Sequence, residues 1–423
     1  MTHARLVALG ALVGIPAAAA AALFLGLVHE LQNWLWTDLP DALGESGPPW
    51  YLVLGLPVVG AALVWCARTM LPGDGGHTPI HGIDPAPAPL SHAPGIVLAA
   101  AGTLGFGMVL GPEAPVVALG SIVAVALASF ARLAAKEAKI LATAGAFAAI
   151  SALFGGPIVA GVMMTESAAP TLGVALVPAL LPGFVAAAIG YVIFVGFGDW
   201  GGLAAPGLVV PDLPLYEGTR VLDLLVAVAV GVATAIVIAA VSALATGRVA
   251  GRLSRRSLAG SLVAGGLAVG LIALLADALG ADSQDILFSG QHSISPLVTE
   301  TSTGIVLLLL AAKAIAYAVS LVAGFRGGPI FPAVFLGIGV ATLPVVWFDV
   351  SPTFAVAAGA AAGMAAYGRF VLTAMLFAAL LVGSRGFDAI PGAVLAAAAA
   401  WITVTALDAR LEERSATAPT PPR

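Results

Sequence analysis

Two short elements of this sequence begin with Gly-Pro and stand before apolar runs, and one of them contains an acidic residue. The first, GPEAP, begins at Gly111 and carries Glu113, and the second, GPIFP, begins at Gly328 and has Ile330 at the matching position. Each element precedes an apolar run, and Gly followed by Pro before such a run is typical of the start of a helix. Because N–H groups at a helix N-terminus are free to bind anions, two converging starts would bind one without a cationic side chain.

Glu113 is an acid inside a long apolar stretch, which makes it a functional candidate. Placing a charged carboxylate within a membrane costs on the order of 2.5 kcal/mol or more. The amides that would bind an anion at a helix start would also stabilise the carboxylate, so Glu113 would occupy the place of the anion until protonation releases it. The alternative is a helix-capping acid without a gating role. Ile330 favours gating, because the scaffold does not require an acid at the second element.

The composition indicates that these elements lie in a membrane. The chain has 423 residues, of which 60% are apolar and 9% are charged, whereas about 25% are charged in an ordinary soluble domain. So few charges cannot cover a water-exposed surface, which excludes soluble enzymes. The 17 Lys and Arg against 22 Asp and Glu give no basic surface for nucleic acid. We expect an all-α polytopic membrane protein with the lipid bilayer as its surroundings.

Gly and Pro interrupt many of the apolar segments, which predicts broken and re-entrant helices. The first span is expected at residues 6–28, but several later segments are shorter than the roughly 20 residues of a straight span. The basic loops at 132–139 and 248–256 should both face the cytoplasm, with the acidic loop between them outside. An even number of crossings must then separate the basic loops. We therefore expect the stretch 140–165 to fold back at Gly155-Gly156-Pro157.

An internal repeat relates the two Gly-Pro elements. GPEAPVVALGSIVA at residues 111–124 aligns with GPIFPAVFLGIGVA at residues 328–341, and eight of the fourteen positions are identical. Two weaker pairs of blocks follow nearly the same offset, GDGGHT with SGQHS and GAFAAISA with GAAAGMAA. Three blocks in the same order are hard to ascribe to a Gly- and Ala-rich composition alone.

The repeat predicts two related membrane halves. Their expected extents are residues 1–212 and 213–409, and a short disordered cytoplasmic tail should follow at 410–423. In transporters, such halves commonly place the solute site where paired broken helices meet near the middle of the membrane. In this sequence, the two Gly-Pro elements are the candidates for these paired broken helices.

Three stretches resemble the CLC family of chloride channels and chloride/proton antiporters. GMVLGPEAPVVALGS, Gly107–Ser121, looks like the G-x-E-x-P gate element of that family, and GPIFP, Gly328–Pro332, is similar to its G-x-F-x-P element. GGPIVAGVMMTES, Gly155–Ser167, resembles the helix that leads to its intracellular side. The resemblance covers about residues 50–408 and implies an inverted-repeat helical fold, a homodimer with one pore per subunit and no cofactor. It identifies Glu113 as the gating glutamate.

The expected anion site consists of backbone from both elements, with some departures from the family pattern. Its residues are Gly111, Pro112 and Ala114 in the first element and Gly328, Pro329, Ile330 and Phe331 in the second. Pro329 has no N–H to donate. Ile330 stands at the place of the family phenylalanine, with Phe331 adjacent. The C-terminal helix expected at Pro391–Leu407 has no tyrosine, so the usual phenol donor of the family is missing.

Two further groups align with functional positions of the family less directly. In the first anion-binding loop, Asp74, Gly75, Gly76 and Thr78 form the candidate set. Asp74 takes the place of the usual serine and would repel an anion unless it is protonated or turned away, and Thr78 is an alternative hydroxyl. For an internal proton path, Ser167 aligns with the inner glutamate and Glu166 precedes it. The alternative for Glu166 is a structural acid bound by neighbouring N–H groups.

These observations favour a protein of the cytoplasmic membrane that transports chloride or a similar small anion, either as a channel or together with protons. A fluoride/proton antiporter of the same fold is one alternative, and a non-transporting membrane scaffold is another. Neither catalytic residues nor a metal site is expected. His77 and His81, with His292, have a metal-like spacing, but Pro79 and Gly82 interrupt the helix that would align them.

Overall fold

The computed structural model describes residues 3–81, 88–172, 176–200, 208–247 and 257–417. Within these ranges the chain is helical, without a β-strand. Eight helical segments of the described chain are long and apolar enough to cross a membrane. The expected all-α polytopic membrane fold is confirmed.

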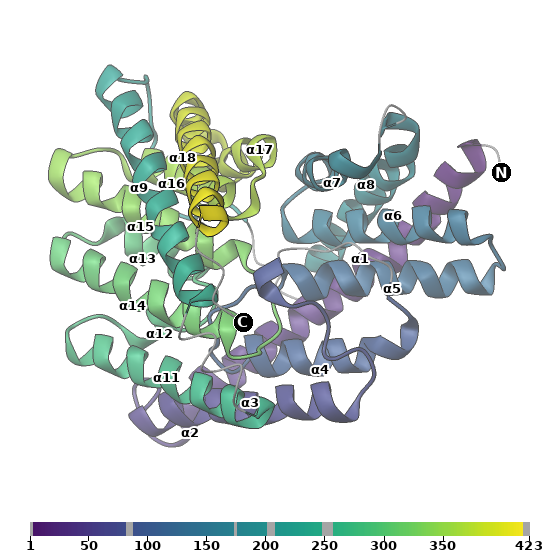
Figure 1. Cartoon of the computed structure of the whole chain (residues 1–423), viewed down its shortest axis with the longest axis horizontal. Helices are drawn as coiled ribbons and strands as arrows, with labels where there is room; N and C mark the ends of the chain where they lie inside the picture. The colour runs from purple at the N-terminus through teal and green to yellow at the C-terminus, as the bar shows by residue number, and fades with distance from the viewer. Residues whose placement is uncertain (1–2, 82–87, 173–175, 201–207, 248–256, 418–423) are drawn as a thin grey trace.

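The first half supplies α1 (His3–Asn33), α2 (Leu39–Ala42), α3 (Trp50–Met70), α4 (Ala93–Leu104), α5 (Glu113–Phe130), α6 (Ala135–Leu153), α7 (Pro157–Leu172) and α8 (Leu176–Trp200). The second supplies α9 (Val221–Thr246), α11 (Leu258–Ala278), α12 (Ser283–Ile286), α13 (Ile294–Thr299), α14 (Thr303–Val322), α15 (Ile330–Phe348), α16 (Pro352–Gly368), α17 (Val371–Val382) and α18 (Ile390–Thr417). In Figure 1, α5 to α8 lie on one side of the molecule and α15 to α18 on the other.

The packing of the helices repeats between these two sides. Helix α5 packs against α6, and α6 against α8, as α15 packs against α16 and α16 against α18. A glycine of α5 packs against a glycine of α6. The equivalent glycines of α15 and α16 pack against each other in the same way. A Cβ on Gly120 would overlap the carbonyl oxygen of Gly145, and a Cβ on Gly337 would overlap that of Gly359. Equivalent glycines therefore permit the same close helix approach in each half.

The predicted breaks in the apolar segments are present. Helix α6 ends at Leu153, Gly155 has a φ of 73°, and Pro157 begins α7. Helices α4 and α17 have 12 residues each, which at 1.5 Å per residue is too short to cross the roughly 30 Å of a bilayer core. The predicted first span at residues 6–28 lies within α1.

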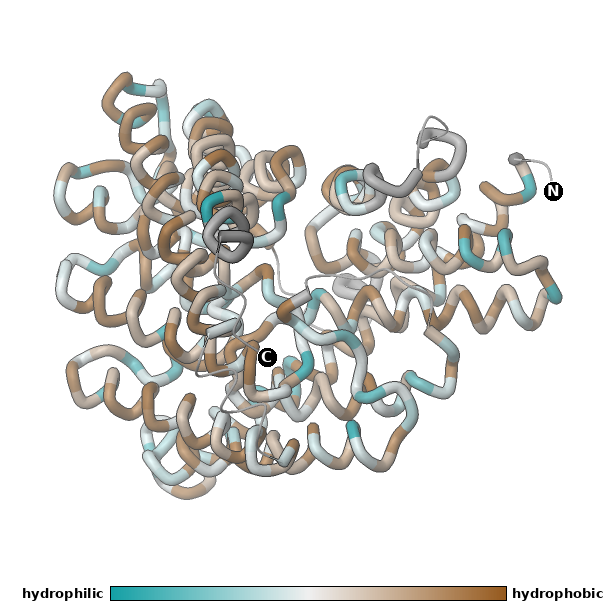
Figure 2. The backbone as a smooth tube through the Cα atoms, viewed as in Figure 1, coloured by the Kyte–Doolittle hydropathy of each residue, from teal (hydrophilic) through white to brown (hydrophobic). Residues whose placement is uncertain are grey.

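The hydrophilic residues gather at helix ends and in the connections, as Figure 2 shows, while apolar residues cover the helices. Helix α18 continues to Thr417, beyond residue 410 where the disordered tail was expected to begin. The division between the halves at residue 212 stays a prediction, and the basic loop at 248–256 lies outside the described residues.

Candidate functional site

Helices α5 and α15 begin at equivalent residues of the repeat. Glu113 is the first residue of α5, and Ile330 is the first residue of α15. Pro112 and Pro329 precede them, where a missing N–H costs no helical hydrogen bond. The predicted helix starts are confirmed.

The preceding glycines join the two helix starts. Gly111 and Gly328 form an isolated antiparallel bridge, in which the N–H of Gly111 donates to the carbonyl oxygen of Gly328 at 2.6 Å and the reverse bond measures 2.5 Å. Tyr317 of α14 supports the second element, since its hydroxyl donates to the carbonyl oxygen of Pro329 at 2.7 Å. The two predicted elements are therefore in direct contact.

The carboxylate of Glu113 lies between these helix starts. The residue is fully buried, and its Oε1 accepts a 2.7 Å hydrogen bond from the backbone N–H of Phe331 in α15. Its Oε2 is also buried and has no hydrogen-bond partner in the described part of the chain. A Cβ on either Gly111 or Gly328 would overlap this carboxylate. The acid of the first half thus occupies the N-terminal amide site of the second half.

Two cavities approach this position. The inner cavity, of about 760 Å³, is lined by Pro329, Ile330, Ser167 and Tyr367, among others. The outer cavity, of about 290 Å³, is lined by Pro112, Phe331, His292 and Leu381, among others. The names follow the expected orientation, because the inner cavity also reaches Thr246, next to the basic segment expected in the cytoplasm.

The two cavities lie at opposite ends of α17. Phe370, directly before this helix, lines the inner cavity, and Leu381, near its last residue, lines the outer one. Residues 329 and 330 face the first cavity and residue 331 faces the second. The start of α15, with the Glu113 carboxylate bound to it, therefore separates them.

The loop at residues 73–78 is held by two arginines. Asp74 forms ion pairs with Arg326 and with Arg68, whose Nε lies 2.8 Å from Oδ1. Arg326 also donates from Nη1 to the Thr78 hydroxyl at 2.9 Å and from Nε to the Asp74 carbonyl at 3.0 Å. Burial raises the pKa of Asp74, but the two arginines outweigh it, so this pKa lies below its ordinary value. Asp74 is turned toward cations, and its charge is compensated.

Successive left-handed residues shape this loop. Gly73, Asp74, Gly75 and Gly76 all have positive φ, between 48° and 96°, a region that glycine enters at little cost. A narrow cavity beside the loop is lined by Gly75 and Gly76 together with Ala114 and Arg326. The loop therefore lies next to the first turn of α5, although the hydroxyl of Thr78 is bound to Arg326.

Glu166 is bound to the start of another helix. Its Oε1 accepts from the N–H groups of Val371 and Leu372 at 3.0 and 2.9 Å, and its Oε2 accepts from the N–H of Thr373 at 2.9 Å and from its hydroxyl at 2.6 Å. These contacts cap α17, which has no side-chain cap of its own. Ser167 donates to the Met163 carbonyl and lines the inner cavity. These contacts are the ones expected if Glu166 is a structural acid bound by N–H groups rather than part of a proton path.

Three residues at the site were missed by the sequence analysis: Arg326, Tyr317 and Tyr367. The rings of Tyr317 and Tyr367 are 5.9 Å apart, and the Tyr367 hydroxyl donates to the carbonyl oxygen of Pro79 at 3.3 Å. A phenol therefore reaches the inner cavity from α16, although α18 has none. Arg326 could have been recognised from its position, because it is a cation two residues before the second Gly-Pro element.

The histidines with metal-like spacing lie apart. His77 lines the narrow cavity beside the 73–78 loop, whereas His292 stacks on His29 of α1. The side chain of His81 lies outside the described residues. In the described part of the chain, no three His, Cys, Asp or Glu side chains are grouped as metal ligands would be.

Replacing Arg326 by Gln is expected to lower the free energy of unfolding by about 1–3 kcal/mol, because it removes charged hydrogen bonds to a partly exposed partner. Thermal melting in detergent measures the change. Arg132→Gln on an exposed loop is the matched control. Since the pKa of Asp74 is lowered in the fold, the stabilisation is present at neutral pH and is lost as pH falls through that pKa. If the effects of Asp74→Asn and Arg326→Gln on the free energy of unfolding simply add in the double variant, the two side chains are not coupled and the prediction is wrong.

The fold and site define a polytopic membrane protein in which two similar halves meet at a buried carboxylate. A family model described as voltage gated chloride channel matches residues 77–405. The chain belongs to this family, known as CLC, and such proteins are channels or transporters rather than enzymes.

Relatives and solved structures agree with this assignment. The putative ion-transport protein YfeO of Escherichia coli (strain SMS-3-5 / SECEC) is 29% identical over 333 residues, covering 78% of this chain and 76% of the relative. A slow cyanobacterial Cl⁻/H⁺ antiporter superposes with a TM-score of 0.78 at 17% identity, covering 99% of both chains. A CLC-type fluoride/proton antiporter superposes at 0.71 with 20% identity, covering 95% of this chain and 96% of the other. At such identities the structural likeness shows the fold alone.

Proposed function

We propose that this protein moves a small monovalent anion across the cytoplasmic membrane, between the inner and outer cavities, with Glu113 as the gate. The observation that carries the proposal is the hydrogen bond from the Phe331 amide to the buried Glu113 carboxylate. A permeating anion needs the same amide, so the charged carboxylate and the anion compete for one place. Protonation removes the competing charge and opens the path.

Backbone provides most of the proposed anion site. In this proposal Gly111, Pro112 and Ala114 surround the anion from the first half, and Gly328 to Phe331 surround it from the second. The amides of Ala114, Ile330 and Phe331 are the donors, since proline has none. The bridge between the glycines supports this arrangement, because it keeps both helix starts at one position.

Chloride is the proposed substrate, and fluoride is the alternative. Structural neighbours include a Cl⁻/H⁺ antiporter and a fluoride/proton antiporter, so the fold is compatible with both. The 73–78 loop supports an atypical anion site, since Asp74 is bound to cations and the Thr78 hydroxyl to Arg326. A membrane scaffold is a weaker hypothesis, because it has no need for two cavities that reach the helix starts on either side of a buried acid.

Proton coupling depends on the role of Glu166 and Ser167. The four hydrogen bonds that Glu166 accepts attach its carboxylate to the start of α17, which favours a structural role over proton transfer. Such a role supports a channel more than an antiporter. A homodimer with one pore per subunit remains part of the proposal through the family resemblance.

Flux from liposomes tests the proposal. Purified protein is reconstituted, and chloride efflux, fluoride efflux and proton uptake are recorded together. We expect efflux of at least one anion, and uphill proton movement would identify an antiporter. If neither anion moves at any pH, the transport proposal is wrong.

Replacing Glu166 by Gln is expected to destabilise the protein by about 0.5–2 kcal/mol, as for loss of a helix cap, while the pH dependence of flux stays unchanged. Melting temperature and pH-dependent efflux are measured on the same preparation. Glu45→Gln makes the same chemical change at an exposed position and serves as the control. Loss of proton uptake with unchanged stability would instead make Glu166 a proton carrier.

A further inference from the structure

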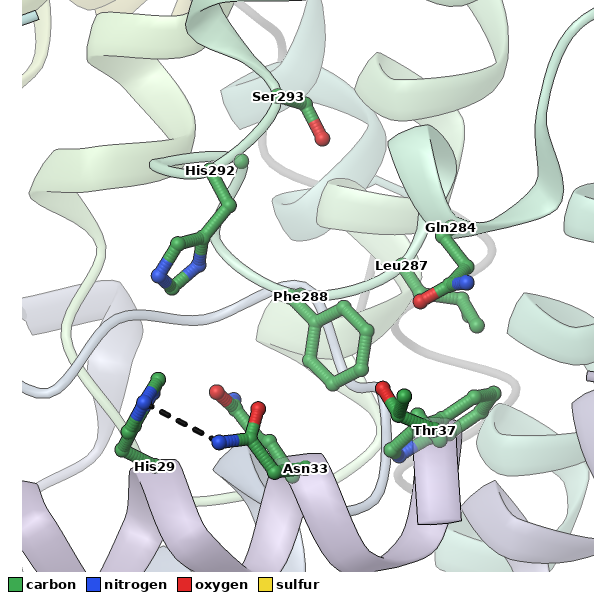
Figure 3. Close-up of a pocket in the computed structure, with 11 residues that line it drawn as sticks. His29, Asn33, Thr37, Gln284, Leu287, Phe288, His292 and Ser293 are labelled. Carbon is green, nitrogen blue, oxygen red and sulfur yellow. Dashed lines mark hydrogen bonds between the residues drawn. The ribbon is translucent and has the colours of Figure 1, made fainter. Parts of the chain in front are cut away.

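A polar pocket of about 190 Å³ lies beside the outer cavity. Side chains of α1 and of the segment around α12 and α13 line it, mainly His29, Gln32, Asn33, Gln284, His292 and Ser293. Figure 3 shows His29 and Asn33 rising from α1 while His292 points toward them from the opposite loop. So many polar groups converging in a chain with 9% charged residues indicate a site that water or an ion occupies.

Two histidines face each other in this pocket. The His29 and His292 rings are stacked with centroids 6.3 Å apart, and the Asn33 amide donates to Nε2 of His29 at 3.2 Å. His292 is exposed toward the pocket. Two imidazoles this close repel each other when both are charged, and an anion between them would relieve that repulsion.

The pocket adjoins the proposed anion path at His292. His292 lines both the polar pocket and the outer cavity, and the outer cavity ends at Pro112 and Phe331. In the internal repeat, the His292 loop is also the counterpart of the 73–78 loop, which lies beside the start of α5. Each half thus places one such loop near the path.

We propose that His29 and His292 form a proton-dependent binding site for a small monovalent anion at the outer mouth, from which the anion enters the outer cavity. This inference rests on the proposed transport function. A protonated imidazole supplies both a cation and N–H donors to the anion. Asn33 and Gln284 provide amide donors beside it.

The charged groups around His292 are already bound to other parts of the protein. Asp285 is bound by the Ser293 side chain and has Asp282 and Lys313 as its charged neighbours. Lys313 is fully buried and donates to the carbonyl oxygens of Asp285 and Leu287 at 3.0 and 2.7 Å, which fixes the loop. The surrounding protein removes part of the hydration of His292, and with His29 nearby this lowers its pKa. The ring is therefore neutral at pH 7 and charges on acidification.

The test uses flux in a Glu113→Gln background, so that the gate itself no longer titrates. The apparent KM for external chloride and fluoride is measured with external pH at about 4.5 and about 7.5, a range that extends well below the ordinary imidazole pKa because the pKa of His292 is lowered. We expect the KM to be about threefold lower at the acidic pH, as for one partly exposed charge pair. Adding His292→Gln should abolish this difference in KM, whereas His77→Gln, at the equivalent position of the other half, should preserve it.

The outcomes separate the two proposals. Absence of flux in both the parent chain and the Glu113→Gln variant contradicts anion transport itself, and if only the parent chain carries flux, the same KM comparison is made in the parent chain. Flux with the same KM at both pH values, or a pH difference that survives His292→Gln, contradicts the histidine site alone. His29→Gln provides a second variant, expected to reduce the pH difference as His292→Gln does, and a monodisperse elution profile verifies that each variant is folded.

Discussion

Replacing Glu113 by Gln is expected to raise anion flux at neutral pH roughly tenfold or more and to make it nearly independent of pH. In the parent chain, the Glu113 side chain accepts a hydrogen bond from the Phe331 amide, and such a bond contributes about 1.5–3 kcal/mol when the acceptor is charged. The neutral amide of Gln has nearly the same size but lacks the charge that competes with an anion. The substitution therefore removes only the competition between the Glu113 charge and the anion for the Phe331 amide.

Efflux from liposomes at a series of pH values measures this effect. Glu45→Gln makes the same chemical change at an exposed position and should retain the pH profile of the parent chain. A Glu113→Gln variant whose flux still rises on acidification would show that another group is the gate. Loss of flux with a normal melting temperature would make Glu113 a required anion or proton ligand instead.

Replacing Gly328 by Ala is expected to reduce anion flux at least about tenfold at every pH. The new Cβ would overlap the Glu113 carboxylate, which lies where the anion is proposed to bind, and Gly328 also pairs with Gly111. Inserting a methyl group into a packed site costs about 1–3 kcal/mol. The expected loss comes from filling the anion position.

The double variant Gly328→Ala/Glu113→Gln separates blockage from gating. If the methyl group fills the anion position, flux stays low after the acid is neutralised. Recovery of flux in the double variant would show that Gly328→Ala acts only by displacing Glu113. Gly47→Ala is the matched control, because a Cβ there meets no atom within 4 Å.

The features that depend on short stretches of sequence could be predicted. The helix starts at Glu113 and Ile330 follow from Gly-Pro before an apolar run, and the break near Gly155 follows from a similar local pattern. The buried acid was evident because so few charges interrupt the apolar segments. Local chemistry determines each of these features.

The features that depend on distant contacts could not be predicted. Arg326 is 252 positions from Asp74, so the sequence suggested an uncompensated acid where the fold places two cations around it. Glu166 caps α17 from 205 positions away, and Tyr367 comes from a helix that family analogy did not indicate. Each partner is identified only when the two halves are packed together.

The bridge between Gly111 and Gly328 makes the proposed gate a property of the fused chain. Glu113 and Ile330 are equivalent in the repeat, yet only one is an acid. A dimer of identical half-length chains could not achieve this, because both copies would bring a carboxylate into the same gap, where like charges repel. Covalent linkage lets the two halves differ at this one position, so that a symmetrical scaffold can hold a single asymmetric switch.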